Sequence, residues 1–379
     1  MEKAKKNLIY IVFLISLLLP LLFSDFKGGG VSESEKRVLA KFPDIELNSL
    51  NSVNEFKDSF DIWFIDNIGF RNSAMRIKAS IEYWLFNVSS NKSVVVGKDG
   101  WLFYTGSSNL EIAAGTYPIS QEKLINIKNN QQKVQDKLHE KGINYLIILV
   151  PSKVSVYPEN LYGNYSIRPT VIDKLSSFLG ENTSIPVINL KNELLDAKVS
   201  DLLYYKQDTH WNDLGAYVGY CSVIKTLNQM NLLSTSPAGI TFTDSTHDGD
   251  LLTMLNVDLP QEESPSININ NSKAFRVQNG EQFTEMAELT KQADVKSFYI
   301  YKNPNVKKYR VLIYGDSFFN SSPITMLLAE NVSELYFVPS YEIMEDMINY
   351  TKPDLVILEI TERFINNLDK VPSPSDISK

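Results

Sequence analysis

Short apolar runs alternate with amphipathic stretches along most of this chain. The runs are five or six residues long, rich in branched side chains, and each predicts a buried strand: Tyr145–Val150, Pro186–Leu190, Tyr309–Tyr314, Ser333–Val338 and Leu355–Glu359. Apolar residues at helical spacing predict helices over residues 121–141, 169–180, 214–230, 320–331 and 341–349. This alternation is typical of an α/β fold in which helices cover both faces of a mainly parallel sheet.

The chain begins differently, with three lysines among its first six residues and then an apolar run from Leu8 to Phe23. A basic end followed by an apolar run is typical of an export signal. Because the following residues form no small-residue cleavage site, we predict an uncleaved signal-anchor over residues 1–26, with the rest of the chain outside the membrane. The alternative is a signal peptide cleaved within Ser24–Gly30, which would release the protein.

Three regions are predicted behind this segment: a linker and helical stalk at residues 27–93, the main domain at 94–370 and a disordered tail at 371–379. In the stalk, aromatic and aliphatic side chains recur at helical spacing over residues 54–64 and 71–86. The polar stretch around 232–302 interrupts the alternation of the main domain. We therefore predict that it is an insertion, such as a small β subdomain or a lid.

Composition limits the classes of function. The 379 residues are 43% hydrophobic and 22% charged, which is enough apolar material for a large core. The net charge is −8 and basic residues do not cluster beyond the N-terminus, so nucleic acid is not an expected partner. The single cysteine, Cys221, excludes an internal disulfide. No nucleotide-binding loop or metal-ligand motif is present, so no cofactor and no metal are expected.

Two segments far apart in the sequence, Tyr205–Trp211 and Arg310–Phe319, together supply an acid, a base and a nucleophile. A serine hydroxyl becomes nucleophilic when an imidazole takes its proton, and a carboxylate on the other ring nitrogen holds that imidazole. Asp208, His210 and Ser317 are the residues that this chemistry requires. We predict that they form a catalytic triad.

The position of Ser317 favours this interpretation. It follows a predicted buried strand across the sharp turn Gly315-Asp316, at the carboxyl end of the sheet, where active sites of such sheets lie. A helix predicted to begin near Asn320 would place the Ser317 N–H close to a helix start, where it favours an oxyanion.

The other two histidines are poorer candidates for the base. His139 lies near the end of a predicted helix, where an imidazole suits the helix dipole. His247 lies in a polar loop with Asp244, Asp248 and Asp250. His210 is therefore the predicted base.

Several segments resemble, in sequence and in order, those of the AlgJ/AlgX-like (DHHW) proteins: Gly97–Tyr104, Val150–Lys153 with Tyr157-Pro158, Asp208–Trp211 and Gly315–Phe318. The resemblance covers most of the chain from about Glu35 onward. It implies a circularly permuted SGNH-hydrolase-like three-layer sandwich, in which the Asp-His segment precedes the serine. Thr209 stands where the family has histidine, and no Gly block or Gly-x-Asn-Asp block supplies the usual remaining oxyanion donors.

The resemblance implies an extracytoplasmic O-acetyltransferase that acts on an exopolysaccharide or cell-wall polysaccharide. In such an enzyme Ser317 would take an acetyl group from a multi-spanning membrane acyltransferase and pass it to a sugar hydroxyl. His210 would act first as base and then as acid, oriented by Asp208. The implied partners are the polysaccharide acceptor, the membrane acyltransferase and the membrane itself through the N-terminal anchor.

Residues near the predicted strand ends are candidate oxyanion or substrate-binding groups: Gly315, Asp316, Trp211, Ser152, Lys153 and Arg363. Lys153, with Ser152 beside it, reaches the mouth of the site or belongs to a solvated loop. Trp211 stacks on a sugar ring or forms a wall of the pocket. Asp316 touches substrate or orients the turn.

Arg363 has two alternatives as well. It meets an anionic sugar, or it pairs with Glu359 or Glu362, and the common occurrence of such ion pairs favours pairing.

Two other functions use the same residues differently. A carbohydrate O-acetyl esterase would have the same triad and let water complete the reaction. A catalytically silent polysaccharide-binding or assembly protein would have lost the triad geometry. The sequence does not separate transfer from hydrolysis.

Overall fold

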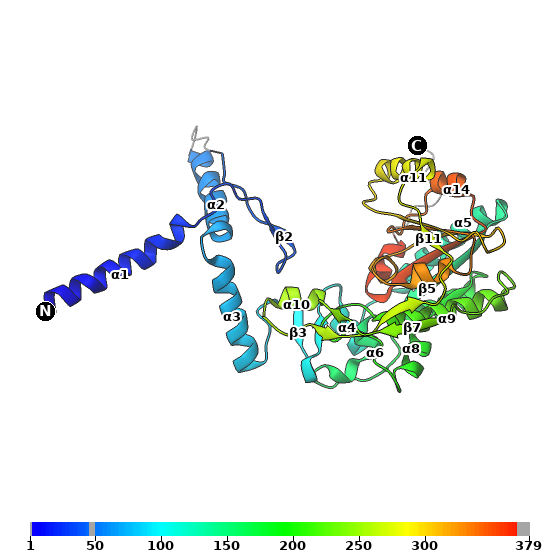
Figure 1. The fold of residues 1–379 in the computed structure, drawn as a ribbon, viewed down its shortest axis with the longest axis horizontal. Coiled ribbons are helices and arrows are strands. Elements are labelled where there is room, and N and C mark those ends of the chain that lie inside the picture. The colour runs from blue at the N-terminus through cyan, green and yellow to red at the C-terminus, as the bar shows by residue number, and fades with distance from the viewer. Residues whose placement is uncertain (1, 45–49, 370–379) are drawn as a thin grey trace. The chain divides into compact units, whose positions relative to one another are not determined.

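A computed structural model describes residues 2–44 and 50–369 of the chain, which divide into two compact units. One consists of Met1–Val96 with Asp250–Pro260, and the other of Gly97–Gly249 with Gln261–Lys379 (Figure 1). The tail predicted at 371–379 lies outside the described residues.

The larger unit contains a seven-stranded sheet in the order β11-β12-β14-β13-β15-β5-β6. The strands are β5 (Asn144–Val150), β6 (Val187–Asn189), β11 (Phe275–Arg276), β12 (Tyr299–Lys302), β13 (Arg310–Tyr314), β14 (Glu334–Val338) and β15 (Leu355–Thr361). From β14 to β6 all neighbours are parallel, whereas β12 and β11 add to one edge antiparallel. The predicted α/β fold with a mainly parallel sheet is confirmed, and all five predicted strands belong to this sheet.

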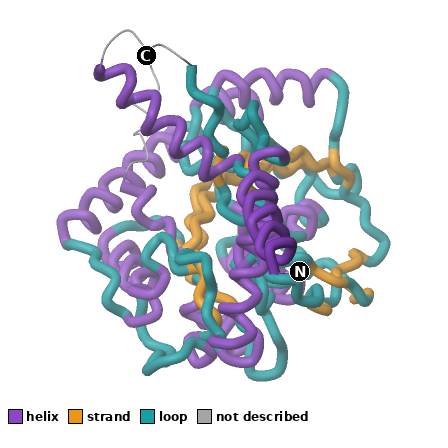
Figure 2. Tube along the Cα trace, turned by 90° about the vertical axis from the view of Figure 1, so that its left-hand side faces the viewer, coloured by secondary structure: helices purple, strands orange, loops and turns teal. Residues whose placement is uncertain are grey.

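Helices lie on both sides of the sheet, with α11 and α14 on one side and α8 and α9 on the other (Figure 1). Figure 2 shows the same chain turned by 90°, with helices in purple and strands in orange. The helices are α4 (Asn109–Ala114), α5 (Gln121–Glu140), α6 (Lys153–Val156), α7 (Val171–Asn182), α8 (Lys191–Ala197), α9 (Asp213–Gln229), α11 (Glu281–Gln292), α12 (Ser317–Asn320), α13 (Ile324–Ala329) and α14 (Glu345–Thr351). Short 3-10 turns occur at Lys98–Gly100 (η1), Pro158–Asn160 (η2) and Glu362–Asp369 (η3).

Local sequence explains why these helices form where they do. In α5 the buried residues recur every three or four positions, as one face of a helix requires: Leu124, Ile127, Gln131, Val134 and Leu138. Ser120 caps this helix by accepting the N–H of Lys123. Asn212 caps α9 in the same way by accepting the N–H of Gly215.

The stretch around 232–302 differs from the predicted insertion. Its first part forms two short antiparallel ribbons, in which β7 (Ile240–Thr243) pairs with β10 (Ser266–Ile269) and β8 (Thr246–His247) with β9 (Glu262–Glu263). Its last part contributes β11 and β12 to the edge of the main sheet. β11 was missed because it is only two residues long and exposed, so no alternation marks it.

The parallel sheet brings three loops to one edge. Val150 at the end of β5 is in register with Thr361 at the end of β15, and Tyr314 at the end of β13 is in register with Leu358. The segments that follow begin with Pro151, Gly315 and Glu362, so residues from distant parts of the sequence meet at the carboxyl edge.

The smaller unit contains α1 (Glu2–Leu22), β1 (Val31–Ser32), β2 (Arg37–Val38), α2 (Leu50–Asn67), α3 (Arg71–Phe86), β3 (Val94–Val96) and α10 (Asp250–Leu255), and the larger unit begins with β4 (Leu102–Tyr104) after η1. The predicted helices of the stalk correspond to α2 and α3. Arg37 donates two hydrogen bonds to Asp66, of 2.6 and 2.8 Å, and the bonds from Arg37 lower the pKa of Asp66 to about 2. None of the helices in the described part of the chain has the length and apolarity needed to cross a membrane, so the predicted anchor is not confirmed.

Candidate active site

Ser317 is the first residue of α12, directly after the turn that ends β13. The single helix predicted over residues 320–331 is instead two short helices, α12 and α13, and the first of them begins three residues earlier than predicted. Asp316 explains the difference, since its carboxylate accepts the N–H of Phe318 at 2.9 Å and caps the helix. The result is a half-buried serine at the carboxyl edge of the sheet.

The carboxylate of Asp316 accepts hydrogen bonds from neighbouring residues of the fold rather than pointing toward a substrate. Besides the Phe318 N–H, its carboxylate accepts the hydroxyl of Tyr341 at 2.8 Å, and both the N–H and the hydroxyl of Thr361, at 2.9 and 2.8 Å. These bonds tie the turn before Ser317 to the end of β15. Of its two sequence alternatives, the geometry favours orienting the turn.

Gly315 is required by close packing. A Cβ at this position would lie 2.4 Å from Oε2 of Glu359, which is fully buried on β15 and accepts the N–H of Asp316 at 2.8 Å. The N–H of Gly315 donates to the carbonyl of Val338. The Gly315 N–H is therefore engaged and not available as an oxyanion donor.

Burial, and after it the charge of Asp316, raises the pKa of Glu359 well above its ordinary value. Between the unfolded pKa near 4.5 and this raised value, the folded chain binds the proton that the unfolded chain has lost. Stability must therefore fall as pH rises through this window, by about 1.4 kcal/mol per pH unit for one group.

We predict that Glu359→Gln removes this loss. Urea unfolding midpoints measured from pH 5 to pH 8 should decline less in the variant than in the wild type. Glu362 is also buried with a raised pKa and is present in both proteins. The change of the urea midpoint with pH is therefore compared between the two proteins, rather than the midpoint at one pH. Glu140→Gln, at an exposed position of α5, is the matched control. Parallel curves for wild type and Glu359→Gln would contradict the prediction.

Asp208 and His210 lie on the loop before α9, held by a bridge between Tyr204 and Trp211. Oδ1 of Asp208 lies 2.7 Å from Nδ1 of His210 and also accepts the His210 backbone N–H at 2.8 Å. Nε2 of His210 lies 2.8 Å from Oγ of Ser317. Because a carboxylate only accepts hydrogen bonds, Nδ1 carries the proton and Nε2 is left to accept the serine hydroxyl.

Lys153 is buried at the base of the acid-base loop rather than exposed in a solvated loop. Its amine is buried and donates to the carbonyls of Tyr205, Lys206 and Asp208, at 3.1, 3.1 and 2.6 Å. The ammonium also lies 5.1 Å from the ring centre of Phe103. The residue fastens the backbone of the acid-base loop, which neither sequence alternative foresaw.

Ser152 and Trp211 are also buried, each 1% exposed. The N–H of Ser152 donates to Glu362 at 3.0 Å, behind the site. The indole N–H of Trp211 donates to the carbonyl of Phe318 at 3.2 Å, and its ring packs on that of Phe318. Trp211 therefore joins the base loop to the nucleophile helix, and this geometry leaves no face for stacking on a sugar.

Arg363 follows β15 and lies beside the nucleophile. Its guanidinium is 5.4 Å from the ring centre of Phe318, and the residue is 8% exposed. Among the described residues it forms no ion pair within 4 Å, with Glu359 and Glu362 included, and its buried Nε has no hydrogen-bond partner. The described residues thus show no close ion pair of Arg363, although its charge acts to lower the pKa of Glu359. Arg363 lines a small hollow with Thr209 and Asn109.

His247 is the residue that sequence reasoning missed. Its Nε2 lies 3.0 Å from Oδ2 of Asp208, and its ring stacks on that of Tyr205 with centres 3.8 Å apart. No local signal could have found it, because a histidine in a polar loop carries no mark of the carboxylate that it meets 39 positions away.

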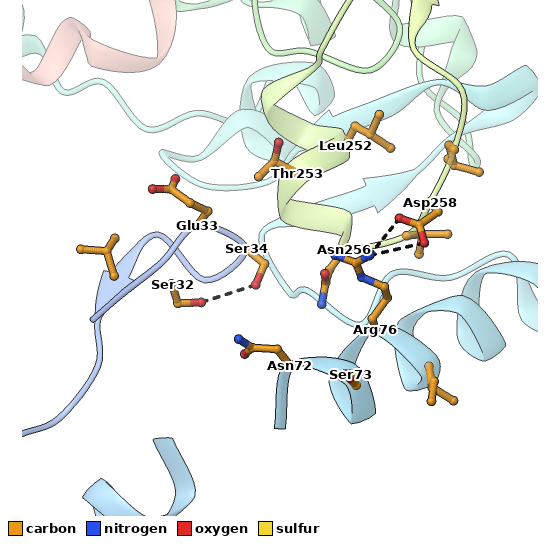
Figure 3. Close-up of a pocket in the computed structure, with 14 residues that line it drawn as sticks. Ser32, Glu33, Ser34, Asn72, Ser73, Arg76, Leu252, Thr253, Asn256 and Asp258 are labelled. Atoms are coloured by element: carbon orange, nitrogen blue, oxygen red, sulfur yellow. Dashed lines mark hydrogen bonds and ion pairs between the residues drawn. The ribbon is translucent and has the colours of Figure 1, made fainter. Parts of the chain in front are cut away.

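A second hollow, of about 740 Å³, lies in the smaller unit (Figure 3). Its lining is polar, with Ser32, Asn72 and Asn256, and Arg76 is bonded to Asp258 at 3.2 Å. It contains none of the predicted site residues, so the candidate active site is the one at Ser317.

Comparison with known proteins agrees with this fold. Residues 94–310, more than half of the chain, match the family described as "SGNH hydrolase-like domain, acetyltransferase AlgX". The chain belongs to this AlgJ/AlgX-like family. The match includes Asp208 and His210 and ends before Ser317, so the partnership of the serine with the histidine rests on the geometry above.

Relatives include the "Probable alginate O-acetylase AlgJ" of Pseudomonas putida and that of Pseudomonas aeruginosa, each 29% identical over 187 and 188 residues. These matches cover 48% of this chain and 46% and 45% of the relatives, so the chain spans about half the length of the curated relatives it matches. Among solved structures, Bacillus cereus PatB1 with a sulfonyl adduct has a TM-score of 0.52 at 16% identity, over 73% of this chain and 95% of that chain. PatB1 therefore shares the fold of this AlgJ/AlgX-like chain.

Proposed function

We propose that this protein is an O-acetyltransferase that moves an acetyl group through Ser317 to a hydroxyl of a polysaccharide. The observation that carries the proposal is the unbroken row of hydrogen bonds from Asp208 through His210 to Ser317, with distances of 2.7 and 2.8 Å. The names of the AlgJ relatives, as alginate O-acetylases, support the choice of acetyl group and of polysaccharide.

Each half of the reaction uses the same three residues. In the first half, Nε2 of His210 takes the hydroxyl proton while Oγ of Ser317 bonds to the acetyl carbon, and the leaving group departs with that proton. In the second half, His210 takes the proton of a sugar hydroxyl, whose oxygen bonds to the acetyl carbon. Ser317 then leaves and recovers its proton. Asp208 stabilises the imidazolium that forms in both halves.

The tetrahedral intermediates need hydrogen-bond donors near Ser317. The structure describes no acceptor for the backbone N–H of Ser317 among the residues that it covers, so this N–H serves as one donor.

The charge of Arg363 indicates that the substrate is an anion. A nearly buried guanidinium without a described carboxylate partner is costly unless an anion binds it. Because this cation lies against the ring of the residue after Ser317, we assign it to an acidic group of the substrate, such as a sugar carboxylate.

The surroundings of the enzyme follow from the same proposal. The basic and then apolar start of the chain is an export signal in either form of processing, so the domain works outside the cytoplasm. A multi-spanning acyltransferase would deliver the acetyl group there. Hydrolysis by the same triad is the alternative, whereas a catalytically silent protein would not need the assembled triad.

The test is intact mass spectrometry of the full chain treated with 4-nitrophenyl acetate. One acetyl group should appear on Ser317, and an oligouronate should remove it faster than buffer or a neutral oligosaccharide does. Equal removal in all three solutions would identify an esterase. Failure of the wild type to form an adduct would overturn the proposal of an acyl-enzyme.

A further inference from the structure

Both oxygens of the Asp208 carboxylate are held by imidazole rings. Oδ1 faces His210, whereas Oδ2 lies 3.0 Å from Nε2 of His247. The side chain of Asp208 is only 7% exposed. Since the carboxylate accepts, both rings donate to it, and the bond from His247 is charge-assisted.

His247 comes to Asp208 on a ribbon that is itself fastened to the acid-base loop. The ribbon pairs His247 of β8 with Glu262 of β9. The Glu262 carboxylate accepts the backbone N–H groups of Lys206 and Gln207, at 2.9 and 3.1 Å. The ribbon therefore binds the two residues that directly precede Asp208.

The packing beside His247 leaves little freedom. A Cβ on Gly249 would lie 1.9 Å from the carbonyl oxygen of Gln207, so only glycine permits this approach of the two backbones. The ring of Tyr205 lies parallel to that of His247, with a 13° angle between the planes. Together these contacts fix the direction in which Nε2 of His247 points.

Both bonds from His210, from its ring Nδ1 and from its backbone N–H, reach Oδ1, whereas the bond from His247 reaches Oδ2. The His247 bond therefore opposes rotation about the Cβ–Cγ bond, which would move Oδ1 away from Nδ1 of His210. We infer that His247 is a positioning residue that prevents this rotation of Asp208, so that His210 keeps the tautomer and orientation needed to accept the Ser317 proton. His247 acts through Asp208 and contacts no reacting atom. The inference rests on the proposed acyl-transfer function and adds a fourth side chain to its machinery.

Two variants of the full chain separate the hydrogen bond from the packing. His247→Phe retains a flat ring against Tyr205 but cannot donate to Asp208, whereas His247→Gln retains an N–H donor. His139→Gln, on the exposed face of α5, is the matched control. His247→Asn, which is polar but too short to reach Asp208, takes the place of the Phe variant if that chain does not fold by urea titration.

The rate of Ser317 acetylation is measured against 4-nitrophenyl acetate concentration. We expect His247→Phe to lower the saturating rate by about 10²-fold, as misplacement by about 1 Å does, with the half-saturating concentration unchanged. His247→Gln should recover most of the rate, and His139→Gln should match the wild type. In parallel, the low-field proton resonance of the His210 Nδ1–H bond should be retained in the Gln variant and lost in the Phe variant.

A wild-type rate in His247→Phe would overturn the inference, as would a Gln variant as slow as the Phe variant. An intact low-field resonance in a slow Phe variant would do the same. If the wild type forms no adduct, the proposed function fails separately. The resonance then decides alone: its selective loss in the Phe variant supports the positioning of Asp208, and its retention overturns it.

Discussion

Ser317→Ala is expected to abolish the acetyl adduct and, with it, all transfer to sugar, a loss of roughly 10⁶-fold in turnover. The variant removes the only oxygen that lies within hydrogen-bonding distance of Nε2 of His210 in the described residues, at 2.8 Å. The change deletes one atom from a half-buried position, so the urea midpoint should move little. Intact mass after 4-nitrophenyl acetate treatment measures the effect.

Ser321→Ala is the matched control, because Ser321 is exposed directly after the same short helix. It should acetylate at the wild-type rate. An acetyl group that still forms at the wild-type rate in Ser317→Ala, or that maps to another residue in the wild type, would remove Ser317 from the mechanism.

Asp208→Asn is expected to slow adduct formation by about 10⁴-fold without unfolding the chain. Asp208 accepts hydrogen bonds on both oxygens, from His210 and from His247. An asparagine has one acceptor oxygen and one NH₂ group, so one imidazole must turn or lose its bond. The imidazolium of His210 also loses its facing negative charge. The rate of Ser317 acetylation in the folded variant is the measurement.

Asp248→Asn is the control for this experiment, since Asp248 is exposed next to His247 and its carboxylate accepts a bond only from Gln261 among the hydrogen bonds described. It should retain the wild-type rate. A rate within about tenfold of wild type in Asp208→Asn would show that the carboxylate is not needed.

The sequence predicted the sheet and the row of reacting groups because both have local signals. Apolar runs mark the buried strands, for example the fully buried β15. The turn at Gly315-Asp316 marks the serine, and the spacing of Asp208 and His210 places the acid beside the base. These features depend on residues close together in the chain.

The surroundings of the site depend on residues far apart, and there the predictions were wrong or incomplete. Nothing in the sequence distinguishes a solvated loop lysine from Lys153, whose long apolar stem lets its amine reach three carbonyls. Nothing in the sequence indicates either that the indole N–H of Trp211 donates to the carbonyl of Phe318. His247 was set aside for its polar neighbours, although the fold carries it to the triad carboxylate.

The position of β13 between β14 and β15 has a consequence for the order in which the protein matures. Both flanking strands come later in the chain than Ser317, whereas Asp208 and His210 come more than one hundred positions earlier. During synthesis, His210 therefore leaves the ribosome long before Ser317. The strand of the serine, β13, leaves before either of its parallel neighbours, β14 and β15. The sheet that holds the strand of the serine is complete only once β15, which ends at Thr361, has been synthesised, so we expect Ser317 to be fixed beside His210 late in folding.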